Sequence, residues 1–195
     1  FTNALIAVLR EAQPKVCFLT GHGERRIEEG AEQGGTLMNN LLGRESYKTE
    51  SIAIKLTDAH VPSDCDVLVI NNPTSDFQPQ EITALDEYMA RGGRIFLLLD
   101  PWIRVNNAGT LGEQLRPWLE QKFGIVVGSD VVVGEAKEQP LQVELNADSA
   151  PFSDDDKKKG FNGCFSSAHP ITRGFDQPMV LQICRTVKPV EKAPA

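Results

Sequence analysis

Residues 66–73 read DVLVINNP, an apolar run that stops at two asparagines and a proline. Four consecutive apolar residues, with no polar residue between them, are typical of a strand that is buried on both faces. Similar runs stand at residues 15–20 (KVCFLT) and 94–99 (RIFLLL), and a weaker one stands at residues 49–54 (TESIAI). These four runs predict the strands of one buried sheet.

Apolar residues at helical spacing occur before and between these strands, at residues 2–12, at residues 34–45, from Pro79 to Gly92 and at residues 110–123. Pro79 suits a first helical position, whereas Pro117 falls inside the last of these segments, where a proline kinks or restarts a helix. Strands that alternate with helices need crossover connections, which favour a mainly parallel sheet with helices on both faces. We therefore predict a doubly wound α/β fold, either flavodoxin-like or class I glutamine amidotransferase-like.

The pattern weakens after residue 135. Residues 125–127 and 131–133 predict two short strands, and residues 179–184 predict a last strand on the edge of the sheet. The expected organisation is one α/β domain over residues 1–188, with a core at 1–135, an irregular extension at 136–188 and a tail at 189–195.

The composition argues against some classes of partner. The 195-residue chain carries a net charge of −7. Because nucleic acids and anionic lipids attract basic surfaces, we expect neither as the main partner. No apolar stretch approaches the roughly 20 residues that span a bilayer. The chain starts at Phe1 without a signal peptide, so we expect a piece of a longer protein whose membrane anchor lies outside it.

Polar residues and glycines follow three of the predicted strands directly. In open parallel sheets, ligands bind beyond the carboxyl ends of the strands. We therefore expect a ligand or a partner to bind at this edge of the sheet, which we call the rim. The predicted rim residues are Thr20, Gly21, His22, Gly23, Glu24, Asn71, Asn72, Asp100 and Trp102.

The GHGE motif at residues 21–24 has three interpretations. Its glycines allow a sharp structural turn. The same residues could recognise a ligand, or His22 and Glu24 could act as base and acid or as metal ligands, with Asp100 as a third ligand. No phosphate-binding glycine motif is present. We predict no metal and no cofactor.

The cysteines give weak support for nucleophilic catalysis. Amidotransferase-like and hydrolase-like folds place the nucleophile on a strained turn after a central strand, but here Asn71 and Asn72 follow that strand. Cys65 precedes the strand, and Cys17 lies within another, where a thiol is typically buried and inert. Cys164, near His169, is the one Cys/His pair that is local in the sequence.

Several blocks together resemble the GldG-like auxiliary proteins of uncharacterised ABC-type transport systems, some of which are linked to gliding motility. The blocks are KVCFLTGHGE (15–24), DCDVLVINNP (64–73), YMARGGR (88–94), LLLDP (97–101), FGI (123–125) and HPIT (169–172). The chain departs from the family in its Asn-Asn-Pro, where the family more often has Gly-Pro.

The resemblance implies a domain held between transmembrane helices, outside the cytoplasm, beside an ABC permease and ATPase. A related domain in an intraflagellar transport protein implies a binding or scaffolding module. For such a module we expect a permease, a polymer or a sugar to bind at the rim. The family has no catalytic residues to carry over, so we predict a non-enzymatic protein. Two alternatives stay open: an amidotransferase-like or hydrolase-like enzyme with a Cys nucleophile, and a structural spacer between membrane segments.

Overall fold

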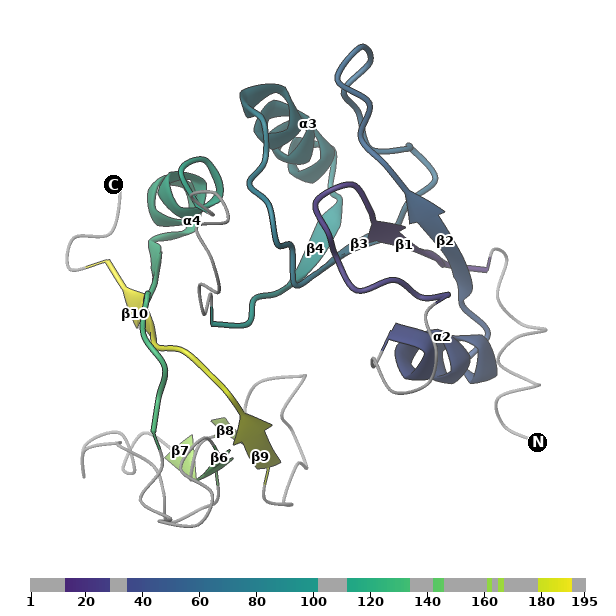
Figure 1. Ribbon diagram of the computed structural model, residues 1–195. Coiled ribbons are helices and arrows are strands. Elements are labelled where there is room, and N and C mark those ends of the chain that lie inside the picture. The colour runs from purple at the N-terminus through teal and green to yellow at the C-terminus, as the bar shows by residue number, and fades with distance from the viewer. Residues whose placement is uncertain are drawn as a thin grey trace. The chain divides into compact units, whose positions relative to one another are not determined.

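A computed structural model describes residues 13–28, 35–101, 112–133, 142–145, 161–162, 165–166 and 179–190 (Figure 1). The chain divides into two compact units. The first comprises residues 1–126 and 189–195, and the second comprises residues 127–188. The expected single domain over residues 1–188 stays a prediction.

Four parallel strands form the sheet of the first unit: β1 (Lys15–Leu19), β2 (Lys48–Ile52), β3 (Val67–Asn71) and β4 (Arg94–Leu98). Their order is β2-β1-β3-β4. All three pairings are parallel, as expected for strands joined by crossover connections. With helices on its two faces (Figure 1), this sheet confirms the predicted doubly wound α/β fold.

Helix α2 (Gly35–Arg44) connects β1 to β2 and covers one face of the sheet. Its Met38 and Leu42 pack against a buried cluster that includes Phe18 and Val69. Because side chains alternate along a strand, the neighbours of Phe18 and Val69 point to the opposite face. The two faces together explain why the strand sequences are almost continuously apolar.

Helix α3 (Pro79–Ala90) connects β3 to β4 and covers the other face (Figure 1). It buries Ala84, Leu85 and Tyr88. The hydroxyl of Tyr88 donates to the carbonyl oxygen of Arg94 at 3.2 Å. Gly92 ends the helix with φ = 92°, a conformation that glycine adopts without strain. The predicted glycine stop is therefore confirmed.

Helix α4 (Leu115–Phe123) begins later than the pattern predicted. Pro117 is its third residue, in the first turn, where backbone N–H groups have no partner inside the helix. The proline therefore costs no helical hydrogen bond, and its interior position in the prediction was wrong. Trp118 is buried and its Nε1 donates to Oδ1 of Asp86 at 2.9 Å.

Strand β5 (Ile125–Val127), which was predicted, pairs with β10 (Val187–Pro189), which was not. The second predicted strand, at 131–133, is wrong. There the ladder gives way to isolated contacts: Oδ1 and Oδ2 of Asp130 accept from the backbone N–H (3.0 Å) and the hydroxyl (2.7 Å) of Thr186. The backbone N–H of Val132 still donates to the carbonyl oxygen of Cys184 at 2.8 Å, but the residues around it form no strand.

In the second unit, β6 (Gln142–Leu145) pairs with β9 (Met179–Gln182) in antiparallel fashion, and β7 (Phe161–Asn162) pairs with β8 (Phe165–Ser166). The expectation of a last strand at the edge of the main sheet is therefore wrong, because β9 finds its partner in β6. The predicted helix at 2–12 lies outside the described residues. Among the described helices, none combines the length and the apolarity needed to cross a bilayer.

Candidate functional site

The loops after β1, β3 and β4 meet at one edge of the sheet because the three strands are adjacent and parallel. The carbonyl oxygen of His22, after β1, accepts hydrogen bonds from the backbone N–H groups of Thr74 (2.7 Å) and Ser75 (2.9 Å), after β3. The N–H of Arg25 donates to the carbonyl oxygen of Asn71 at 2.9 Å. Backbone hydrogen bonds thus fasten the GHGE turn to the loop that leads into α3.

The side chain of His22 lies between two carboxylates. Its Nδ1 is 3.1 Å from Oε1 of Glu24, and its Nε2 is 3.0 Å from Oε2 of Glu81. The exposed fractions of the three residues are 7%, 5% and 4%, so the group is buried. We call these three residues the His22 cluster. It joins the turn after β1 to the first turn of α3.

The His22 cluster favours a protonated imidazole. An ionised carboxylate only accepts hydrogen bonds, so both ring nitrogens must donate when both carboxylates are ionised. Burial alone would lower the pKa of His22, but the hydrogen bonds to Glu24 and Glu81 and their negative charges outweigh it and raise the pKa above its ordinary value of 6.5. The folded chain therefore holds the proton of His22 more tightly than a free imidazole does.

Further contacts fix the orientation of the cluster. The ring of Phe77 stacks on the His22 ring, with the centroids 4.2 Å apart and an angle of 20° between the planes. Oε2 of Glu81 also accepts from the backbone N–H of Gln78 at 2.8 Å. Oε2 of Glu24 accepts from the backbone N–H of His22 at 2.7 Å. Both ring nitrogens of His22 and both carboxylates of the cluster therefore have partners within the fold.

Gly23 is required by this arrangement. Its φ is 74°, and a Cβ atom built on it would lie 2.0 Å from Oγ1 of Thr74. A side chain at this position would thus force the Thr74 side chain to shift and would disturb the hydrogen bond from its hydroxyl to the carbonyl oxygen of His22. Gly21 also has a positive φ, of 128°, but a Cβ there would meet nothing within 4 Å. The motif needs its second glycine for close approach and its first for backbone conformation alone.

A second group of polar residues lies on the outside of the rim. Nη2 of Arg25 donates to Oδ2 of Asp100 at 2.5 Å, with both side chains nearly half exposed. The backbone N–H of Asp100 donates to Oδ1 of Asn72 at 3.2 Å. Asn72 has a φ of 56°, which asparagine tolerates better than most residues. These contacts link the ends of β1, β3 and β4 at the surface.

The structure thus divides the predicted rim residues into different environments. His22 and Glu24 are buried in the His22 cluster, whereas Asn72 and Asp100 are partly exposed. The hydroxyl of Thr20 donates to the carbonyl oxygen of Ile52 at 2.9 Å, toward β2. Asn71 is buried at the end of β3. Trp102 lies outside the described residues.

Sequence reasoning missed Glu81, Phe77 and Arg25 as members of this region. Glu81 carried a partial signal, since it is an acidic residue in the first turn of a predicted helix and stands three positions after Gln78, the spacing of a capping box. No local pattern indicated that it would meet His22, 59 residues earlier in the chain. Arg25 follows the GHGE motif directly.

The metal interpretation of GHGE receives no support from the described part of the chain, where no three His, Cys, Asp or Glu side chains are arranged to hold a metal ion. Asp100, the expected third ligand, instead contacts Arg25 and Asn72.

Two of the described cysteines belong to the first unit. Cys17 and Cys65 are both buried and both are free thiols. A hydrogen bond between the two thiols raises the pKa of Cys17, with burial adding to the effect, and lowers the pKa of Cys65. Cys65 precedes β3, at the amino end of the sheet. Cys164 and His169 lie outside the described residues.

Two solved structures share the fold. The first, "mmIFT52 N-terminal domain", has a TM-score of 0.55 at 16% identity, over 91% of this chain and 69% of that one. The second is a putative ThuA-like protein from Bacteroides uniformis, with a TM-score of 0.50 at 16% identity, over 90% of this chain and 59% of that one. At this identity the likeness concerns the fold alone. No curated protein matches the chain.

A family of auxiliary proteins, described as ABC-type uncharacterized transport system, matches residues 13–194. The match covers nearly the whole chain, including the sheet, the GHGE turn and the second unit. The chain belongs to this family, the auxiliary components of ABC-type transport systems.

Proposed function

We propose that this chain is a soluble, non-catalytic domain of a membrane-anchored auxiliary component of an ABC-type transport system, and that it binds a partner subunit or a ligand at the rim. Membership of the family supports the role of an auxiliary component of an ABC-type transport system. The resemblance to GldG-like proteins adds an extracytoplasmic location, a link to gliding motility in some members, and the permease and ATPase as partners.

The division of the rim supports its role in binding. The His22 cluster provides a fixed base, because its polar groups are all paired and buried. At the same end of the sheet, the side chains of Asn72, Arg25 and Asp100 are at least partly exposed to solvent. Polar groups held on a rigid base can engage a partner with little loss of conformational freedom. A non-catalytic role agrees with the burial of Cys17 and Cys65, away from the rim.

Affinity purification of the full-length protein from gently solubilised native membranes, with mass spectrometry, tests the proposal. We expect an ABC ATPase and its permease to be recovered. Recovery of the protein alone, from the soluble fraction, would contradict the transport role. In that case, alkylation of the thiols would test whether any turnover depends on Cys65.

Two variants separate the rim from the rest of the surface. Asp100→Ala removes an exposed carboxylate that pairs with Arg25 at the carboxyl end of the sheet. Asp64→Ala removes an exposed carboxylate that pairs with Lys15 at the amino end. We expect Asp100→Ala to reduce recovery of the partners and Asp64→Ala to leave it unchanged. Equal recovery with both variants would show that the rim is not the binding surface.

A further inference from the structure

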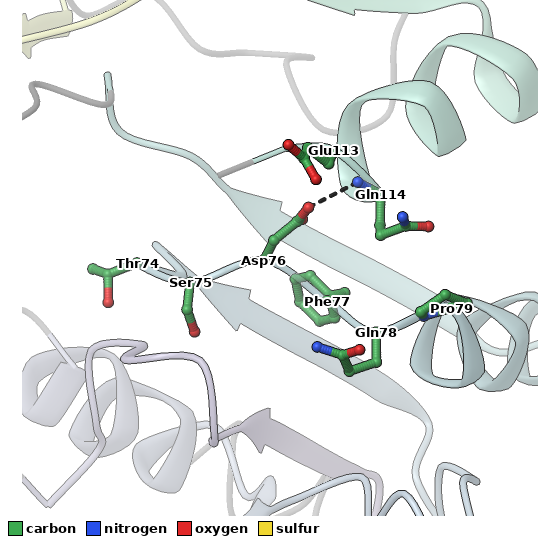
Figure 2. Close-up of a pocket in the computed structure, with 8 residues that line it drawn as sticks. All are labelled: Thr74, Ser75, Asp76, Phe77, Gln78, Pro79, Glu113 and Gln114. Atoms are coloured by element: carbon green, nitrogen blue, oxygen red, sulfur yellow. Dashed lines mark hydrogen bonds between the residues drawn. The ribbon is translucent and has the colours of Figure 1, made fainter. Parts of the chain in front are cut away.

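A pocket of about 390 Å³ lies beside the loop after β3. It is lined by residues 74–79, which lead into α3, and by Glu113 and Gln114, which precede α4 (Figure 2). Its volume is near the lower end of the range for small-molecule sites, about 300–1,000 Å³. None of the predicted rim residues lines it, although it continues from the same end of β3.

The walls of the pocket are fixed by contacts within the first unit. The carboxylate of Asp76 points at the start of α4, where it accepts from the backbone N–H groups of Gln114 (2.8 Å) and Leu115 (3.4 Å) (Figure 2). The backbone of Ser75 is held by the carbonyl oxygen of His22. Glu81 holds the N–H of Gln78. A pocket fixed in this way is largely formed before a ligand arrives.

The lining excludes an anionic ligand. It contains the carboxylates of Asp76 and Glu113 and no basic side chain among the described lining residues. The two helix N-termini that border the pocket would attract an anion, but each already faces a carboxylate, Asp76 at α4 and Glu81 at α3. A phosphate or a carboxylate ligand would be repelled.

A simple cation is also disfavoured. Both oxygens of Asp76 accept hydrogen bonds from the α4 backbone. Glu113 is exposed to solvent, where its charge is screened. The site therefore offers a cation one well-hydrated carboxylate and one that is already engaged.

The polar groups that line the pocket are suited to bind the hydroxyl groups of a ligand. The amides of Gln78 and Gln114 each supply donors and an acceptor, the hydroxyl of Ser75 can do both, and the carboxylate of Glu113 accepts. The hydroxyl of Thr74 donates to the carbonyl oxygen of His22 at 3.2 Å, and its oxygen can still accept. A sugar hydroxyl likewise donates and accepts. Phe77 and Pro79 add apolar atoms to the same lining. We propose that this pocket binds a neutral carbohydrate of one or two residues, a site that goes beyond the proposed binding of a partner or a ligand at the rim.

The pocket is tested by NMR with the 195-residue chain, by following backbone amide shifts. Glucose, maltose and cellobiose serve as neutral carbohydrates, choline as a cation and inorganic phosphate as an anion. We expect at least one of the sugars to shift the amides of residues 74–78 and 113–114, at millimolar concentrations. If none of the sugars shifts these amides, or if choline or phosphate shifts them more strongly, the inference is wrong.

Two variants show whether the pocket itself is occupied. Ser75→Trp fills the opening from an exposed position, and Gln114→Ala removes one amide while leaving Asp76 to cap α4. Each should weaken sugar binding by about tenfold or more. Glu87→Trp, an exposed site on α3 outside the lining, is the matched control and should bind as the natural chain does. Unchanged binding by Ser75→Trp and Gln114→Ala would overturn the assignment.

The two proposals fail separately. If the sugars do not bind but Asp100→Ala still reduces recovery of the transport subunits, the carbohydrate inference falls and the rim proposal stands. If the sugars bind in the pocket but no ABC subunit is recovered from membranes, the transport role falls and the pocket stands as a carbohydrate site.

Discussion

The His22 cluster and the Arg25–Asp100 pair lie at the same edge of the sheet, and residues 22 and 25 are three positions apart in the sequence. In the first, the three side chains are buried, and the imidazole and both carboxylates have partners inside the fold. In the second, both side chains are nearly half exposed. Charged residues in one short segment thus occupy two environments: one group holds the loops together, and the other faces solvent.

The largest effect on the unfolding free energy is expected for a substitution in the His22 cluster. His22→Ala leaves the carboxylates of Glu24 and Glu81 buried without their positive partner, and loss of one partner of a buried ionic group costs about 3–5 kcal/mol of unfolding free energy. Urea unfolding measures this loss. His60→Ala is the control, since the side chain of His60 is exposed, and it should change the free energy by less than about 0.5 kcal/mol. Similar values for the two variants would refute the structural role of His22.

The pH dependence of the unfolding free energy tests whether the buried His22 is charged in the folded state. Because the folded state raises the pKa of His22, the folded chain holds this proton more tightly than the unfolded chain. The contribution is complete below the ordinary value of 6.5 and is lost as the pH rises through the folded pKa. This loss of unfolding free energy at high pH should be smaller than the loss in His22→Ala, because a neutral imidazole still donates one N–H hydrogen bond. Urea unfolding from pH 6 to 9 should show a decline that His22→Gln lacks; parallel curves would contradict the charged cluster.

A third effect concerns the contact between the turn and the loop. Gly23→Ala places a Cβ against Thr74 and imposes a positive φ on alanine, and overpacking of this kind costs about 1–3 kcal/mol. In a Thr74→Ala background, the steric part of the cost should fall, because Oγ1 is the nearest atom. A double-mutant cycle measures the coupling. Additive effects would mean that the cost comes from the backbone conformation alone.

The smallest effect is expected at the exposed pair. Arg25→Ala should lower the unfolding free energy by at most about 1 kcal/mol, because solvent screens partly exposed ion pairs. The loss should shrink further at high salt. A loss as large as that of His22→Ala would remove the distinction between a structural and a presented group of charges.

Much of the fold could be predicted from the sequence because the strands are buried on both faces and their apolar runs are therefore nearly uninterrupted. The start of α4 could not, since Pro117 has opposite meanings in a first turn and in a helix interior. The pairing of β9 with β6 could not be predicted either, because the sequence of an apolar strand does not indicate which strand it pairs with. Local sequence patterns thus predicted the presence of helices and strands better than they predicted which strands pair.

The rim shows the same limit at the level of side chains. The position of GHGE after a buried strand correctly indicated a turn where three loops meet. The burial of His22 depended on Glu81 and Phe77, more than 50 residues away, and on the direction of α3. The capping of α4 by Asp76 spans 38 residues and left no local signal. Which polar residues are structural and which are exposed followed from tertiary contacts alone.

The charge state of His22 tests the account most directly. The pKa of each histidine can be measured by NMR, from the pH dependence of the imidazole carbon and proton shifts, with the exposed His60 as an internal reference. We predict a pKa for His22 above 6.5, as expected for a ring that donates to two buried carboxylates. A pKa below 6.5, the result of burial without these partners, would contradict the His22 cluster and with it the scaffold on which the rim is built.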